Sequence, residues 1–156
     1  MGMPAQLSGN TLLGSLRWQA ILAGFVTDVG TTQVFGFVVG IVAGVATAAH
    51  GANPAEASGI FFQSTRLMVI FGAIGSLFTV VGGFVTGRLA PRARYWNVSV
   101  MVVIDMLYGL VDYSPKVPLW LNITLFAAAL PCAFLGAFLA GFFVRPEAQP
   151  PPLPQR

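Results

Sequence analysis

The sequence predicts an all-α fold, an integral membrane bundle of four transmembrane helices that form two antiparallel hairpins. Three observations predict it. Hydrophobic residues make up 56% of the chain and charged residues only 8%, whereas a soluble domain has roughly 25% charged residues. The apolar residues fall in long runs bounded by aromatic residues and prolines, and small residues recur within those runs at helical spacing. A chain of 156 residues is long enough for one such domain.

The first helix is expected at residues 18–49, because Arg17 and Trp18 are typical of a membrane interface and no proline follows before His50. At 1.5 Å per residue this helix is roughly 50 Å long, more than a hydrocarbon core of ~30 Å, so it must tilt, protrude or break. Small or polar residues occupy every fourth position, and because this row drifts around the helix, its two halves should meet different neighbours. The row consists of Ala20, Gly24, Asp28, Thr32, Gly36, Gly40, Gly44 and Ala48.

The second helix is expected at residues 54–89. Asn53, Pro54 and Glu56 match an N-cap, a first helical position and a capping-box glutamate. The turn from the first helix is then very short, so the two helices should form a hairpin. The small and polar residues of the second helix are predicted to face the first helix. They are Gly72, Ser76, Thr79, Gly83 and Gly87.

The third and fourth helices are expected at residues 96–112 and 119–144, on either side of a proline-containing turn. The third helix is roughly 26 Å long, which is just enough to cross a membrane. Pro131 lies near the middle of the fourth helix and predicts a kink.

The remaining segments and the orientation follow from composition and charge. Residues 1–16 are expected to be a short cytoplasmic segment, with the first span as an uncleaved anchor, and residues 146–156 a disordered, proline-rich cytoplasmic tail. The positive-inside rule places both termini in the cytoplasm of a multi-pass protein of the cytoplasmic membrane. The basic residues on that side are Arg17, Arg88, Arg92, Arg94, Arg145 and Arg156, against Arg66 and Lys116 on the other.

Two aspartates inside apolar spans are the main functional signal. Counted from the cytoplasmic ends of their helices, Asp28 lies roughly 16 Å deep and Asp105 roughly 14 Å deep. Thr79 lies roughly 14 Å deep on the second helix, so these three side chains are expected at one level and could converge. An unpaired carboxylate at this depth is costly, so each should be protonated, hydrogen-bonded or in a water-filled cavity.

Two interpretations of the aspartates stay open. Asp105, Tyr108 and Asp112 share one helix face, and Thr32 follows Asp28 by one turn, so these residues could form half of a proton or cation path. Alternatively, the two aspartates are neutral, hydrogen-bonded locks between helices.

Five glycines are expected to serve helix packing. The favoured interpretation is close packing within one chain, and the alternative is an oligomer interface. The glycines are Gly36, Gly40 and Gly44, which form a doubled GxxxG pattern, and Gly83 and Gly87.

Several function classes are disfavoured. The basic residues form no stripe with interleaved aromatics, so nucleic-acid binding is not expected. One histidine and one cysteine, His50 and Cys132, provide neither a metal cluster nor a catalytic dyad. The sequence contains no nucleotide or cofactor fingerprint, so no catalytic residues, metal or cofactor are expected.

The sequence therefore favours a non-enzymatic integral membrane protein, a helix-packing scaffold or an accessory subunit of the cytoplasmic membrane. The alternative is a small proton- or cation-coupled transporter or channel that uses the aspartate pair. The expected partners are membrane lipid and either further copies of the chain or another membrane protein.

Overall fold

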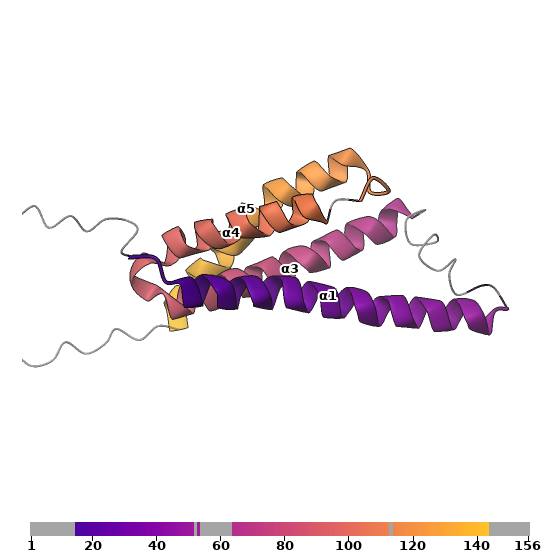
Figure 1. The fold of residues 1–156 in the computed structure, drawn as a ribbon, viewed down its shortest axis with the longest axis horizontal. Helices are drawn as coiled ribbons and strands as arrows, with labels where there is room; N and C mark the ends of the chain where they lie inside the picture. The colour runs from indigo at the N-terminus through magenta and orange to yellow at the C-terminus, as the bar shows by residue number, and fades with distance from the viewer. Residues whose placement is uncertain (1–14, 52, 54–63, 113, 144–156) are drawn as a thin grey trace, which may run out of the picture.

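The computed structural model describes residues 15–51, 53, 64–112 and 114–143. The prediction of an all-helical fold is confirmed for these residues, which contain no strand. The predicted start of the second helix at Pro54, the N-terminal segment and the tail lie outside them. The elements are α1 (Trp18–Ala49), α3 (Thr65–Leu89), the short 3-10 helix η3 (Pro91–Ala93), α4 (Arg94–Val111) and α5 (Leu119–Phe143), as Figure 1 shows.

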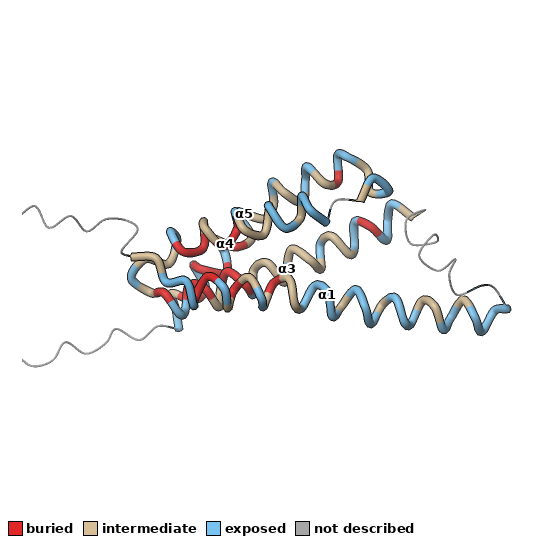
Figure 2. Tube along the Cα trace, in the orientation of Figure 1, coloured by how far each residue is buried: buried red, intermediate tan, exposed pale blue. Residues whose placement is uncertain are grey.

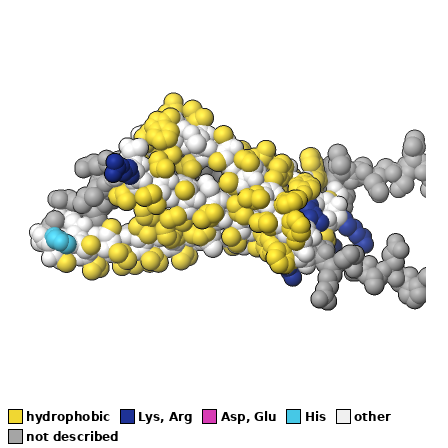
Figure 3. All heavy atoms as spheres, turned by 180° about the vertical axis from the view of Figure 1, so that it is seen from behind, with side chains coloured by type: hydrophobic (Ala, Val, Ile, Leu, Met, Phe, Trp, Pro, Cys, Tyr) yellow, Lys and Arg dark blue, Asp and Glu magenta, His cyan; other side chains and the backbone are white. Residues whose placement is uncertain are grey.

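Three of these helices, α1, α3 and α5, are long and apolar enough to cross a membrane. Helix α4 has 18 residues and is not among them, so its crossing stays a prediction. The face drawn in Figure 3 is broadly hydrophobic, with Lys and Arg side chains only near its two ends. This distribution matches an apolar band between two polar surfaces.

The predicted arrangement as two antiparallel hairpins is not confirmed. Helix α3 contacts all three other long helices, and its most extensive contact is with α5 rather than with α1. The starts of α1 and α4 lie at the same end of the bundle as the ends of α3 and α5 (Figure 1). Helix α3 is therefore the central element of the fold.

Glycines of α3 and α5 bring these two helices into close contact. A Cβ atom at Gly83 would overlap the backbone of Ala133, and one at Gly87 would lie 2.9 Å from the Cα of Ala137. In return, a Cβ at Gly136 would overlap the backbone carbonyl of Val80. The prediction that this row of α3 faces the first helix is therefore wrong for Gly83 and Gly87, which pack against α5.

Helix α3 meets α1 through a different glycine. Gly24 of α1 and Gly82 of α3 lie against each other, and a Cβ at Gly82 would come within 2.9 Å of the Gly24 carbonyl oxygen. Thr86, fully buried one turn further on, donates a hydrogen bond of 3.3 Å to the Ala20 carbonyl. Small residues thus allow α3 to approach two helices on two of its faces.

Most of the buried residues lie at one end of the bundle (Figure 2), with Met68 and Leu121 buried toward the other. Asn97, fully buried at the end that holds most of them, accepts a 2.7 Å hydrogen bond from the Arg17 backbone N–H and donates to the Ser15 and Ala93 carbonyls. These bonds hold the segment before α1 against α4. The buried apolar side chains that pack together at this end are Ile21, Val98, Met101, Val102, Ala133 and Ala137.

The second half of α1 extends away from this core. At Gly36, Gly40 and Gly44 a Cβ atom would meet nothing within 4 Å in the described part of the chain. Large apolar neighbours such as Phe37 are exposed, at 70%. Phe35 of α1 still contacts Phe71 and Phe78 of α3, at ring-centroid distances of 5.4 and 5.6 Å, but no described residue packs against the three glycines. Their role in helix packing therefore stays a prediction.

Pro131 lies inside α5 and is exposed. It has no backbone N–H to donate to the carbonyl of Ala127, so the hydrogen-bond ladder of α5 lacks one bond there. The position separates the part of α5 around Ala129 from the part that packs against α3 at Ala133.

We expect Gly136→Ala to destabilise the protein by about 1–3 kcal/mol, because the new methyl group would overlap the α3 backbone. Gly40→Ala is the matched control: it should leave stability unchanged or raise it slightly, since alanine favours the helix and the site is open. Thermal unfolding of the two purified variants in detergent measures both effects. Equal melting temperatures would contradict the assigned packing.

Candidate functional site

An open cavity of about 340 Å³ lies among the four long helices. Helices α1, α3, α4 and α5 each contribute to its wall. The lining combines two acids, three hydroxyl side chains, one amide, small residues and several apolar side chains. The residues are Asp28, Thr32, Phe71, Gly72, Gly75, Ser76, Thr79, Asp105, Met106, Gly109, Asn122, Leu125, Phe126 and Ala129.

The cavity occupies the half of the bundle away from the buried core. On α5 it is lined from Asn122 to Ala129, whereas the core begins at Ala133. On α4 it is lined from Asp105 onward, whereas the core residues end at Val102. The two aspartates therefore lie where the packed half meets the open half.

Asp28 is 6% exposed and is the one acidic residue of α1. The Cβ of Asp28 lies against Gly82 of α3, and a larger residue at position 82 would displace the Asp28 side chain. Its carboxyl group faces the side chains of Thr79 and Asp105. The row of small residues that brings α1 onto α3 thus also positions this acid.

Asp105 approaches Asp28 from α4. Both of its carboxyl oxygens are buried, and neither accepts a hydrogen bond from an N–H or hydroxyl group of the described residues. The two carboxyl groups lie within hydrogen-bonding reach of each other, so a proton on either one can join them. Burying two acids together costs free energy, and ionisable groups inside a membrane usually mark functional sites.

Neutral side chains with oxygen atoms line the same cavity as the two acids. The Ser76 hydroxyl donates to the Gly72 carbonyl at 3.0 Å, and the Asn122 amide N–H donates to the Val117 carbonyl at 3.3 Å. The Thr79 hydroxyl lies 3.4 Å from the Gly75 carbonyl and also faces Asp28. Because the hydroxyl O–H and amide N–H groups point to backbone carbonyls, the oxygen atoms of these side chains keep lone pairs with which to bind a cation.

The structure brings together four of the predicted site residues, namely Asp28, Asp105, Thr32 and Thr79. Tyr108 and Asp112 do not line the cavity. The Tyr108 hydroxyl accepts a 3.0 Å hydrogen bond from the amide of Gln33, and Asp112 is exposed at the end of α4. The predicted polar stripe on α4 is therefore limited to Asp105.

The sequence pattern did not indicate that Ser76, Asn122 and Gly75 line the cavity. Ser76 lies three residues before Thr79 on α3, so its shared helix face was a usable signal. Asn122 is on α5, which carried no other polar signal at this level. Gly75 gives space, because a Cβ there would meet nothing within 4 Å in the described ranges.

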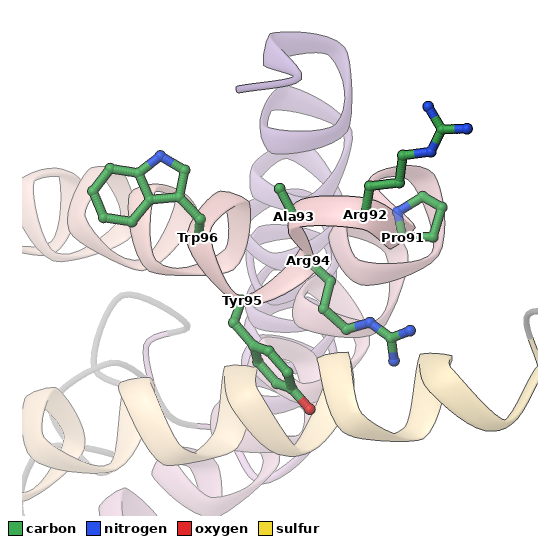
Figure 4. Close-up of a pocket in the computed structure, with 6 residues that line it drawn as sticks. All are labelled: Pro91, Arg92, Ala93, Arg94, Tyr95 and Trp96. Atoms are coloured by element: carbon green, nitrogen blue, oxygen red, sulfur yellow. The ribbon is translucent and has the colours of Figure 1, made fainter. Parts of the chain in front are cut away.

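A second cavity, of about 380 Å³, lies at the turn between α3 and α4. Its side chains diverge: Arg94 and Tyr95 point toward α5, whereas Arg92 and Trp96 point away from it (Figure 4). Arg94 donates a long hydrogen bond of 3.5 Å to the Ala137 carbonyl. Because no set of polar groups converges there, this turn is less suited to hold a ligand than the acidic cavity.

The donor set of the acidic cavity is hard, with carboxylate, hydroxyl and amide oxygens. No cluster of three or more histidine, cysteine or acidic side chains that could hold a metal ion occurs in the residues that the structure describes. The arrangement fits a proton or a singly charged cation better than a transition metal. No protein-family model, curated protein or solved structure matches the chain.

We expect Asp105→Leu to retain or raise the melting temperature in detergent, because it removes a buried carboxyl group whose close polar neighbour is another acid, Asp28. Asn97→Leu is the contrasting variant. It removes several buried hydrogen bonds and should cost about 1–3 kcal/mol. A large loss of stability in Asp105→Leu would instead favour an interhelical lock.

Proposed function

We propose that the protein is a non-enzymatic carrier of the cytoplasmic membrane that couples the movement of a proton to that of a cation. The supporting observation is the shared cavity in which Asp28 and Asp105 meet, with both carboxyl oxygens of Asp105 buried. Ionisable residues inside a membrane are rare and usually mark ion pathways or proton relays.

The difference between the two halves of the bundle supports a carrier rather than an open channel. The core around Met101 and Ala137 fills one half, so the path from the aspartates to that end is closed by side chains. The other half holds the cavity. A carrier binds its substrate near the middle of the membrane and opens to one side at a time.

In this proposal α4 is the fourth transmembrane span. Its 18 residues extend about 27 Å, close to the thickness of the hydrocarbon core. The positive-inside rule places the packed end, with Arg17, Arg88 and Arg94, on the cytoplasmic side. The cavity then lies toward the external side, and both chain termini are cytoplasmic.

A scaffold or accessory subunit is the second candidate, and one observation favours it. The outer half of α1 presents Gly36, Gly40 and Gly44 without any contact in the described residues. Small residues at this spacing allow close helix–helix association in a membrane. The partner would then be another copy of the chain or another membrane protein. This function gives the buried acid pair no role beyond a lock between helices and leaves the cavity unused, so we rank it below the carrier.

Transport in proteoliposomes tests the carrier. We expect an outward-directed proton gradient to drive protons out of the vesicles when a suitable cation is present outside. This proton movement should depend on Asp105. The cations to compare are Na⁺, K⁺, tetramethylammonium and benzyltrimethylammonium, and an internal pH-sensitive dye measures the flux. Asp105→Asn should reduce this flux by about tenfold or more, because it removes the ionisable group.

Asp112→Asn is the matched control for that experiment, since it neutralises an exposed acid on the same helix. It should transport as the unaltered protein does. Absence of flux with all four cations, from protein that is folded and correctly inserted, would rule out the carrier and favour the scaffold.

A further inference from the structure

We propose that the cation taken by this cavity is a singly charged organic ammonium ion with an apolar body. This inference rests on the proposed carrier function and narrows its substrate class. It is carried by the size of the cavity, by the division of its lining into polar and apolar parts, and by the pair of carboxyl groups, Asp28 and Asp105, in its wall.

The size of the cavity argues against a bare inorganic ion. Protein sites for small organic molecules enclose about 300–1,000 Å³, and this cavity of about 340 Å³ lies in that range. An alkali-metal ion is instead held by a close shell of oxygen ligands on every side. Glycine at position 75 contributes to the free space, because a Cβ atom there would meet nothing within 4 Å in the described structure.

The lining of the cavity is chemically divided. Asp28, Asp105 and Thr79 group together where the cavity meets the packed half of the bundle. Aromatic and aliphatic side chains, Phe71 and Phe126 among them, line the rest of the wall. Two acids can hold one positive charge, and aromatic rings attract organic ammonium ions while also packing against apolar groups. An ion with a charged head and an apolar body satisfies both parts.

The two carboxyl groups explain why binding of the cation is coupled to release of a proton. Two nearby carboxyl groups in an apolar setting favour sharing one proton. An ammonium ion that binds to the pair makes that proton dispensable, so binding of the ion and release of the proton become linked. No bond is formed or broken apart from the O–H bond of one carboxyl group, and the proton goes to water.

Binding to the purified full-length protein in lipid nanodiscs tests this inference. The probe is benzyltrimethylammonium, with neopentylbenzene as its uncharged counterpart of the same shape and Na⁺ as the inorganic competitor. We expect saturable binding of benzyltrimethylammonium by isothermal titration calorimetry, with no displacement by neopentylbenzene. Asp105→Asn should weaken this binding about tenfold or more.

Gly75→Leu tests the use of the cavity itself. The new side chain has room and would fill the space that the apolar body needs, so binding of benzyltrimethylammonium should fall about tenfold or more. Gly30→Leu is the matched control, because position 30 of α1 is equally open but does not line the cavity. It should bind as the unaltered protein does. Melting temperatures of both variants verify folding.

The outcomes separate this inference from the carrier function. Asp105-dependent proton flux with Na⁺ or K⁺, together with no binding of benzyltrimethylammonium, would overturn the organic substrate and leave the carrier standing. Binding that Gly75→Leu does not change, in folded protein, would also overturn it. Binding that requires both Asp105 and an open position 75 supports it, and proton flux with the same ion supports both proposals.

Discussion

Close contact between the backbones of α3 and α5 is the interaction on which the rest of this structure depends. It requires glycine at positions 83 and 136, because at each a side chain would overlap the backbone of the facing helix. In a membrane, where lipid is as apolar as the side chains, such contact is a main source of helix association. It joins the backbones of the two helices at one end. Toward the other end α3 and α5 meet through a side chain instead, since a Cβ at Gly72 would lie 2.9 Å from the Leu125 side chain, and both residues line the cavity.

Buried polar side chains differ in their hydrogen bonding between the two halves of the bundle. In the packed half, Asn97 and Thr86 are fully buried and hydrogen-bonded to backbone groups. At the boundary, Asp105 is buried with no such bond in the described chain. The first two side chains stabilise the fold, whereas the third lowers its stability. Proteins commonly tolerate such a cost at a functional site.

Hydrophobic runs and their flanking residues were sufficient to predict the helices, and α1 begins at Trp18 as the interfacial pattern indicates. Residue counting along helices placed Asp28 and Asp105 at one level, and both line one cavity. The partners of the glycines could not be predicted, because a small residue shows that a helix can approach but not which one does. Gly83 therefore faces α5 instead of α1, and Gly40 contacts nothing in the described residues.

Pro131 divides α5 where the two halves of the bundle meet. The segment after it is held against α3 by Ala133 and Gly136, and the segment before it lines the cavity. A proline at this point removes one backbone hydrogen bond from α5. The residue that weakens the helix therefore lies at the boundary between the segment whose backbone packs against α3 and the segment that lines the cavity.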